Sequence, residues 1–235
     1  MEHLPMAQGT FHIITFGCQM NVNDSFWLAR SLQRRGFVIL NTCSVRDKPE
    51  QKVYAALGRI KYETRRVPGS FAVVAGCVAQ QIGAGFFERF PQVRLVVGGD
   101  GLAMAPDAIE RLHGDPSLRL NLTDFSEIYP ERDPALPAQG EGEIPPVAFV
   151  NIMQGCDNFC TYCIVPFTRG RQKSRDAGAI LDECRALIDN GAKEITLLGQ
   201  NVNSYGLDKH ASGDTSFARL LRKVSELPGL ARLRF

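Results

Sequence analysis

An alternation of short apolar runs with amphipathic stretches constrains the fold of this chain more than any other feature. In the first half, the apolar runs lie at residues 11–16, 37–40, 71–75 and 94–97, and residues with helical periodicity follow them. Strands that alternate with helices in this way indicate a parallel sheet covered by helices. We therefore predict an α/β protein whose amino-terminal domain, residues 1–122, is a Rossmann-like parallel sheet.

The helices between these strands are predicted from capping residues and periodicity. Asn21 or Asn23 can cap the first helix, and Gly36 can end it. Its expected apolar face consists of Val22, Phe26, Leu28, Ala29 and Leu32. Further helices are expected over residues 49–64, from the third strand to about residue 90, and over residues 106–113.

Three cysteines occupy equivalent places in this pattern. Cys18, Cys43 and Cys77 each lie one to three residues beyond the end of a predicted strand. The carboxyl ends of parallel strands meet at one edge of a sheet, where ligands bind, and neighbouring strands are about 4.8 Å apart. We therefore expect these thiols to meet in a metal site. The alternative is three unrelated buried cysteines, because cysteine outside disulfides is commonly buried.

Three other cysteines stand much closer together. Cys156, Cys160 and Cys163 have the spacing C-x3-C-x2-C on a loop that leaves the apolar run 147–152. Three thiolates this close suit a soft metal or a redox site. Zinc usually takes four protein ligands, and no fourth Cys or His lies nearby in the sequence. An iron–sulfur cluster on three cysteines leaves one iron open to a small molecule, while zinc and chance remain alternatives.

A change of composition separates the two halves of the chain. Residues 123–146 hold five of the 13 prolines and six acidic residues, which is typical of an extended linker; a surface loop within one domain is the alternative. Beyond it, strands are predicted at 147–153, 195–198 and 230–235, with helices at 177–190 and 217–226. This is less than half of an α/β barrel, so we predict a truncated barrel domain over residues 147–235.

The overall composition is that of an ordinary globular protein, with a net charge of +2 that neither demands nor excludes a nucleic-acid partner. No apolar run approaches the roughly 18 residues of a membrane span, and the first residues do not have the pattern of a secretory signal. We therefore expect a cytoplasmic protein with no membrane association. The seventh cysteine, Cys184, lies inside a predicted helix and is interpreted as a packing residue.

Longer words around the cysteines resemble the methylthiotransferase branch of the radical S-adenosylmethionine (SAM) enzymes. The similarity extends from about residue 15 to residue 235. The words are FGCQMN at 16–21, NTCSVR at 41–46, AGCVAQ at 75–80, GCDNFCTYCIVPFTRGRQKSR at 155–175 and LLGQNVNSYG at 197–206. Members that act on prenylated adenosine in tRNA carry these words, whereas members that act on threonylcarbamoyladenosine or on a ribosomal protein have different words around the first two cysteines and after the second barrel strand.

The resemblance implies a radical SAM barrel and SAM with two 4Fe–4S clusters as cofactors. It implies that the cluster that binds SAM is held by Cys156, Cys160 and Cys163. It implies that an auxiliary cluster is held by Cys18, Cys43 and Cys77. It implies contacts to the cofactor, or to RNA phosphates for the basic residues, from Tyr162, Arg169, Arg175, Gln200 and Asn201. For the basic run at 169–175, a solvated charged face is the alternative; no catalytic acid or base is assigned.

The implied activity is a transferase reaction, the methylthiolation of carbon 2 of N6-dimethylallyl (isopentenyl) adenosine next to the tRNA anticodon. The implied partners are tRNA and a reductant such as flavodoxin or ferredoxin, and the expected state is a monomer. Another substrate within the family is one alternative, and a cluster-carrying electron-transfer or scaffold protein is another.

The chain departs from the family pattern in three ways. It has a shorter connection at Gly36–Val38, where we predict missing residues, and Gln172 where glutamate is common. It also ends before the rest of the barrel and the small RNA-binding domain, so this chain is expected to need those parts for activity.

Overall fold

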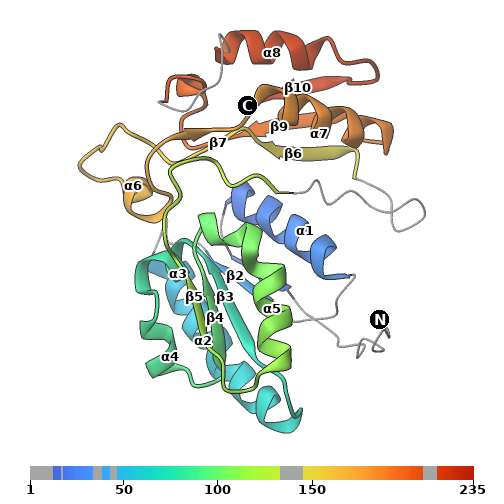
Figure 1. The fold of residues 1–235 in the computed structure, drawn as a ribbon. Coiled ribbons are helices and arrows are strands. Elements are labelled where there is room, and N and C mark those ends of the chain that lie inside the picture. The colour runs from blue at the N-terminus through green and yellow to red at the C-terminus, as the bar shows by residue number, and fades with distance from the viewer. Residues whose placement is uncertain (1–12, 17, 34–38, 43–46, 133–144, 209–215) are drawn as a thin grey trace. The chain divides into compact units, whose positions relative to one another are not determined.

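The fold is seen in a computed structural model that describes residues 13–16, 18–33, 39–42, 47–132, 145–208 and 216–235 (Figure 1). The chain divides into two compact units, Met1–Asp124 and Phe125–Phe235. The boundary between them falls within the Pro-rich segment 123–146. Within the described residues, no helix is both long enough and apolar enough to cross a membrane.

Unit 1 is built on a parallel five-stranded sheet, as the alternation in the sequence predicts. The strands pair in chain order and are β1 (Ile13–Thr15), β2 (Ile39–Thr42), β3 (Ala72–Gly76), β4 (Val93–Val97) and β5 (Leu120–Leu122). Only β5 was not expected, because its three residues carry too little pattern to stand out. The predicted Rossmann-like α/β fold of this unit is confirmed.

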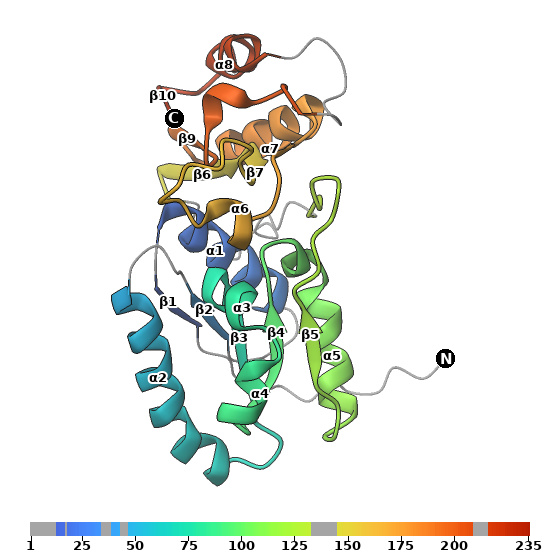
Figure 2. The same cartoon turned by 90° about the vertical axis from the view of Figure 1, so that its left-hand side faces the viewer.

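Helices cover both faces of this sheet (Figures 1 and 2). One face is covered by α1 (Gln19–Gln33), the 3₁₀ helix η1 (Asp100–Met104) and α5 (Ala105–Gly114), and the other by α2 (Asp47–Arg66), α3 (Cys77–Ile82) and α4 (Gly85–Arg89). Strand β3 is apolar at every position because Val73 and Ala75 pack on the first face and Ala72 and Val74 on the second. A strand buried on both faces reads as a continuous apolar run.

Three local predictions in unit 1 are wrong. Helix α1 begins at Gln19, so Asn21 lies inside it and not at its cap, and its amide donates to the carbonyl oxygen of Phe16 at 3.4 Å. Phe26, expected in the core, is 47% exposed, whereas Leu28 and Leu32 are fully buried. The helix expected up to residue 90 is interrupted at Gly83, whose φ of 54° suits glycine.

The two crossovers that link β1 to β2 and β2 to β3 differ in hand. Helices α1 and α2 lie on opposite faces, although both link parallel strands that advance in the same direction. The two crossovers therefore have opposite hands, and nearly all such crossovers in proteins are right-handed. The predicted break at Gly36–Val38 involves residues outside the described ranges, and it stays a prediction.

Unit 2 holds a smaller parallel sheet in the order β10–β9–β6, formed by β6 (Val147–Asn151), β9 (Glu194–Leu198) and β10 (Arg232–Arg234). Helices α7 (Ala177–Asp189) and α8 (Phe217–Ser225) pack on one face of it. The side chains of Asp176 and Ser216 cap these helices by accepting hydrogen bonds from Ala179 N and Arg219 N. Parallel strands with all their helices on one face form the partial barrel that the sequence predicts.

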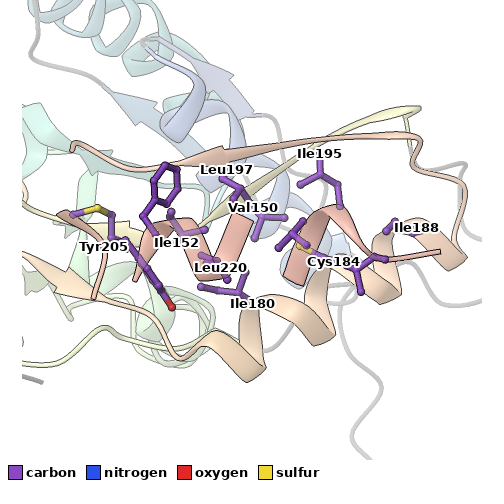
Figure 3. Close-up of a cluster of buried hydrophobic side chains, with 13 residues drawn as sticks. Val150, Ile152, Ile180, Cys184, Ile188, Ile195, Leu197, Tyr205 and Leu220 are labelled. Atoms are coloured by element: carbon purple, nitrogen blue, oxygen red, sulfur yellow. The ribbon is translucent and has the colours of Figure 1, made fainter. Parts of the chain in front are cut away.

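The core of unit 2 lies between this sheet and its two helices (Figure 3). Val150, Ile195 and Leu197 of the strands meet Ile180 of α7 and Leu220 of α8. Cys184 is fully buried among them, and burial raises the pKa of its thiol to about 12. The interpretation of Cys184 as a packing residue is confirmed.

Short elements connect β6 to α7. The predicted strand 147–153 is wrong as one element, because it splits at Ile152 into β6 and β7 (Met153–Gln154). Strand β7 pairs antiparallel with β8 (Lys173–Ser174). Between them lie the cysteine loop, residues 155–164, and the short helix α6 (Val165–Thr168), and a second 3₁₀ helix, η2 (Val202–Ser204), follows β9.

Candidate metal centre

The cysteine loop begins at a position that only glycine can occupy. Gly155 has a φ of 80°, and a Cβ there would overlap the carbonyl oxygen of Arg171 and lie 2.6 Å from that of Gly170. The outgoing and returning chains therefore approach each other at backbone contact distance. This close approach fixes where the loop leaves the β7–β8 ribbon.

Four hydrogen bonds fix the loop further. Gly155 N donates to Gln200 Oε1 at 2.7 Å, and Cys156 N donates to the carbonyl oxygen of Gly170 at 3.2 Å. Cys163 N donates to the carbonyl oxygen of Cys160 at 2.9 Å, and Gln172 N donates to Asp157 Oδ1 at 3.2 Å. The backbone that carries the cysteines is thus held in place by contacts that need no metal.

The three thiols of the loop differ in exposure. Cys156 is buried, Cys163 is partly exposed and Cys160 is exposed, and none of the three is bridged to another cysteine. Throughout the described ranges, no three His, Cys, Asp or Glu side chains gather closely enough to hold a single metal ion. In an iron–sulfur cluster each thiolate binds a different iron, so its sulfurs need not converge on one point.

The donor set therefore fits a cluster better than a zinc ion. Thiolates are the usual ligands of iron–sulfur clusters, and this loop offers three thiols and no imidazole. A second feature points to a ligand near the loop: Asn151, 3% exposed at the end of β6, has an Oδ1 with no hydrogen-bond partner among the described residues. Buried polar atoms are rarely left unpaired, and a bound molecule is one way of satisfying this one.

The other predicted cofactor contacts, which lie on the cysteine loop, directly after α6 and just beyond β9, have different surroundings. Tyr162 is 91% exposed, whereas Arg169 is only 3% exposed. The side chain of Gln200 holds Gly155 N, as described above, and Asn201 Nδ2 donates to Ser204 Oγ at 2.6 Å. Gln200 therefore orients the start of the cysteine loop in this structure.

Arg175 is the centre of a buried ion-pair network, which the sequence did not indicate. Its Nη1 lies 2.6 Å from Glu183 Oε2 and donates to the carbonyl oxygen of Asn151 at 2.9 Å, and its Nη2 lies 3.0 Å from Glu131 Oε2. The guanidinium also lies 5.4 Å from the ring centre of Tyr129. Burial alone lowers the pKa of Arg175, but the nearby Glu183, Tyr129 and Glu131 more than offset this and raise it.

Residues 125–132, part of the predicted linker, pack against the rest of unit 2 through this network and two further contacts. Lys173, 2% exposed, donates from Nζ to the carbonyl oxygen of Ser126 at 3.1 Å. The ring of Phe125 lies against Gly170, where an added Cβ would be 2.9 Å from it. Since the Gly170 carbonyl accepts from Cys156 N, segment 125–132 is joined through one residue to the first cysteine of the loop.

The cysteines of unit 1 come from separate elements. Cys77 is the first residue of α3 and is 5% exposed. Cys18 is exposed just before α1, with its Sγ 3.6 Å from Asn21 Oδ1. Cys43 lies outside the described residues, but the residues before it and before Cys77, Thr42 and Gly76, are register partners in β2 and β3. The meeting of these three thiols, with sulfurs within about 7 Å as in a cluster, stays a prediction.

Two family models match the chain. The model of the radical SAM superfamily matches residues 150–228, and that of an uncharacterized protein family, UPF0004, matches residues 10–98. The first match contains the whole cysteine loop of unit 2, and the second contains the three cysteines of unit 1.

Several curated proteins are similar over nearly the whole chain. The tRNA-2-methylthio-N(6)-dimethylallyladenosine synthase of Nitratidesulfovibrio vulgaris, strain Hildenborough, is 67% identical over 240 residues, which cover 98% of this chain and 53% of that protein. The proteins of the same name from Lawsonia intracellularis and Geobacter sulfurreducens are 62% and 45% identical, over 98% and 95% of this chain and 54% and 51% of their own. The chain thus spans about half the length of the curated relatives it matches.

Two solved structures share the fold. The cobalamin-dependent SAM radical enzyme OxsB has a TM-score of 0.55 at 11% identity, over 94% of this chain and 37% of that one. The radical SAM methyltransferase TsrM from Kitasatospora setae has a TM-score of 0.54 at 14% identity, over 93% and 51%. Residues 150–228, which include the cysteine loop, thus match the radical SAM superfamily. Over nearly its whole length, the chain is similar to the tRNA-2-methylthio-N(6)-dimethylallyladenosine synthases.

Proposed function

We propose that this protein takes part in the methylthiolation of carbon 2 of N6-dimethylallyladenosine in tRNA. The observation that carries the proposal is the 67% identity to a synthase of that name over 98% of the chain, which includes both sets of cysteines. The activity is proposed for the protein with its complete barrel, because the relatives are about twice as long as this chain.

The cofactors in this proposal are SAM and two 4Fe–4S clusters, one on Cys156, Cys160 and Cys163 and the other on Cys18, Cys43 and Cys77. When bound, the first cluster and SAM supply the radical that an unactivated C–H bond requires, which no side chain can provide. The protein's own residues keep the loop in shape: Gly155 permits the close approach to Arg171, and Gln200 and Gly170 hold the backbone of Gly155 and Cys156.

Support for cofactor binding near the loop comes from Asn151. Its Oδ1 is buried and without a partner among the described residues, and it lies at the carboxyl end of β6, where barrel enzymes bind their ligands. We therefore propose that Asn151 contacts the bound cofactor. Tyr162 is proposed as a cofactor contact as well, because it is exposed and lies between Cys160 and Cys163 in the sequence.

Arg169 and Asn201 are proposed as contacts to the cofactor, and Arg175 has a different role. Arg175 is a positioning residue, since its guanidinium is occupied by Glu131, Glu183 and the backbone of Asn151.

We further propose a monomer in the cytoplasm that receives electrons from a flavodoxin or ferredoxin. Domains are proposed at 1–122 and 147–235, with 123–146 between them.

Mass spectrometry of tRNA nucleosides tests the function. We expect a strain that lacks this gene to accumulate N6-dimethylallyladenosine without the 2-methylthio group. Return of the wild-type gene restores the modified nucleoside, and return of a Cys160→Ala gene does not. Unchanged levels of the 2-methylthio nucleoside in the deletion strain would contradict the proposal.

A further inference from the structure

An exposed group of aromatic residues and one arginine stands beside the cysteines of unit 2, and the cluster chemistry does not require it. Phe159 lies directly before Cys160 on the loop, and Phe167 lies on α6. Their rings meet edge to face, with centres 6.3 Å apart and planes at 88°. The guanidinium carbon of Arg171 lies 4.5 Å from the ring centre of Phe159. We call Phe159, Phe167 and Arg171 the aromatic shelf.

The shelf remains open to solvent even though its members contact one another. Phe159 is 45% exposed and Phe167 is 67% exposed. The side chain of Arg171 is 72% exposed and lies 3.4 Å from Asp157 Oδ1. Asp157 also accepts from Gln172 N, so the arginine is tied to a fixed part of the loop and keeps one side of its guanidinium free to stack.

The backbone at Phe159 has a conformation that residues with a side chain rarely adopt. Its φ is 45°, the only positive φ of a residue other than glycine in the described ranges. A bulky residue in this region is an outlier, and such strain clusters at functional sites. Here the strain turns a phenylalanine ring outward, next to a proposed cluster ligand.

We propose that the aromatic shelf binds an unpaired purine base of the RNA substrate by stacking. Proteins that recognise unpaired RNA bases stack them on aromatic rings and on arginine guanidinium planes, and the shelf offers both kinds of surface. The positive charge of Arg171 complements the phosphates that flank such a base. The inference rests on the proposed function, which supplies RNA as the substrate, and it adds the residues that receive the base.

The test measures RNA binding and not product. The probe is a fluorescently labelled anticodon stem-loop with an unpaired adenosine beside the anticodon, titrated under anaerobic conditions. We expect Phe159→Leu and Phe167→Leu each to weaken binding about tenfold, because leucine keeps the apolar volume and loses the stacking face. Phe167→Tyr should bind as the wild type does. Arg171→Gln should weaken binding and reduce its salt dependence.

Two controls separate the shelf from general effects. Arg185→Gln removes another exposed arginine that is paired with a carboxylate, at 2.6 Å from Asp182, and it should leave RNA affinity unchanged. A fully paired hairpin of the same length should bind weakly to every variant. Unchanged thermal midpoints and iron contents verify that the variants fold, and Phe167→Leu stands alone as the test if Phe159→Leu loses its cluster.

The outcomes distinguish this inference from the proposed function. Shelf variants that bind the stem-loop as tightly as the wild type, or that weaken only the binding of SAM, overturn the inference while the tRNA modification stands. In the opposite case, RNA binding depends on the shelf while deletion of the gene leaves the tRNA nucleosides unchanged. That result supports the inference and contradicts the proposed reaction.

Discussion

In unit 2 three cysteines lie on one loop, whereas in unit 1 the matching three follow three different strands. The loop of unit 2 is held by the close backbone approach at its first residue, Gly155, and by contacts with Gln200 and the Gly170 carbonyl outside it. In unit 1, Cys18 precedes α1 and Cys77 begins α3, and their places depend on the order and register of the sheet. A local motif can therefore be identified from spacing alone, while a dispersed one requires the fold.

This difference implies unequal tolerance to change. The loop depends on a few close backbone contacts, so one added methyl group can disrupt it. The thiols of unit 1 depend on a sheet with cores on both faces, so single changes there should be absorbed more easily. The experiments that follow test or sharpen this contrast.

The largest effect is expected from Gly155→Ala. The added Cβ overlaps the carbonyl oxygen of Arg171, and the φ of 80° disfavours any side chain. We expect unit 2 to lose about 3 kcal/mol or more of stability and the purified protein to lose about half of its iron, the half assigned to the loop cluster. Gly58→Ala is the matched control in unit 1, because nothing lies within 4 Å of the added Cβ. Full iron content in Gly155→Ala would contradict the proposed sensitivity of the loop.

The next effect is expected from Arg175→Met. Removal of the guanidinium leaves the partly exposed Glu131 and Glu183 carboxylates without their buried partner, and the loss of hydrogen bonds to a charged group costs about 1.5–3 kcal/mol. Urea unfolding followed by circular dichroism measures the loss.

Arg185→Met serves as the control for Arg175→Met, since its ion pair with Asp182 is exposed and such pairs contribute about 0–1 kcal/mol. Equal losses from the two variants would mean that Arg175 does not hold segment 125–132 in place.

A smaller effect concerns Cys184, the cysteine that belongs to neither set. Its pKa is raised to about 12 by burial, above the ordinary value of about 8.5 for a thiol. In the unfolded chain the thiol ionises first, so its contribution to stability is complete below about pH 8.5 and is lost as the pH rises toward 12. We expect Cys184→Ala to cost about 1–2 kcal/mol, to flatten this alkaline loss, and to leave the iron content unchanged. Loss of iron from this variant would show that the assignment of ligands is wrong.

The sequence predicted the architecture because strands and helices depend on local pattern. Apolar runs predicted four of the five strands in unit 1 and all three in the sheet of unit 2. The strands β5, β7 and β8 were missed, since two or three residues show no periodicity. The residue type of Asn21 favours a helix cap, but α1 begins earlier, at Gln19.

The parts of the site that sequence did not predict depend on contacts between distant residues. Arg175 was expected near the cofactor, yet its partner Glu131 lies 44 positions away, in a segment interpreted as a linker. Lys173 was part of a run that reads as a charged surface, but it is buried beneath residues 125–126. Gly155 offered a signal, because a glycine directly before a metal-binding cysteine often marks a close backbone approach.

The central claim is that the two sets of cysteines have different functions in the reaction. The most direct test replaces one exposed cysteine from each set. Cys160 and Cys18 are both exposed, so alanine at either position should disturb folding little, which circular dichroism can verify. In the protein with its complete barrel, supplied with SAM, tRNA and a strong reductant, we expect Cys160→Ala to form neither 5′-deoxyadenosine nor methylthiolated tRNA. Cys18→Ala should still form 5′-deoxyadenosine and transfer no methylthio group. A folded Cys18→Ala protein that methylthiolates tRNA at the wild-type rate would contradict the account.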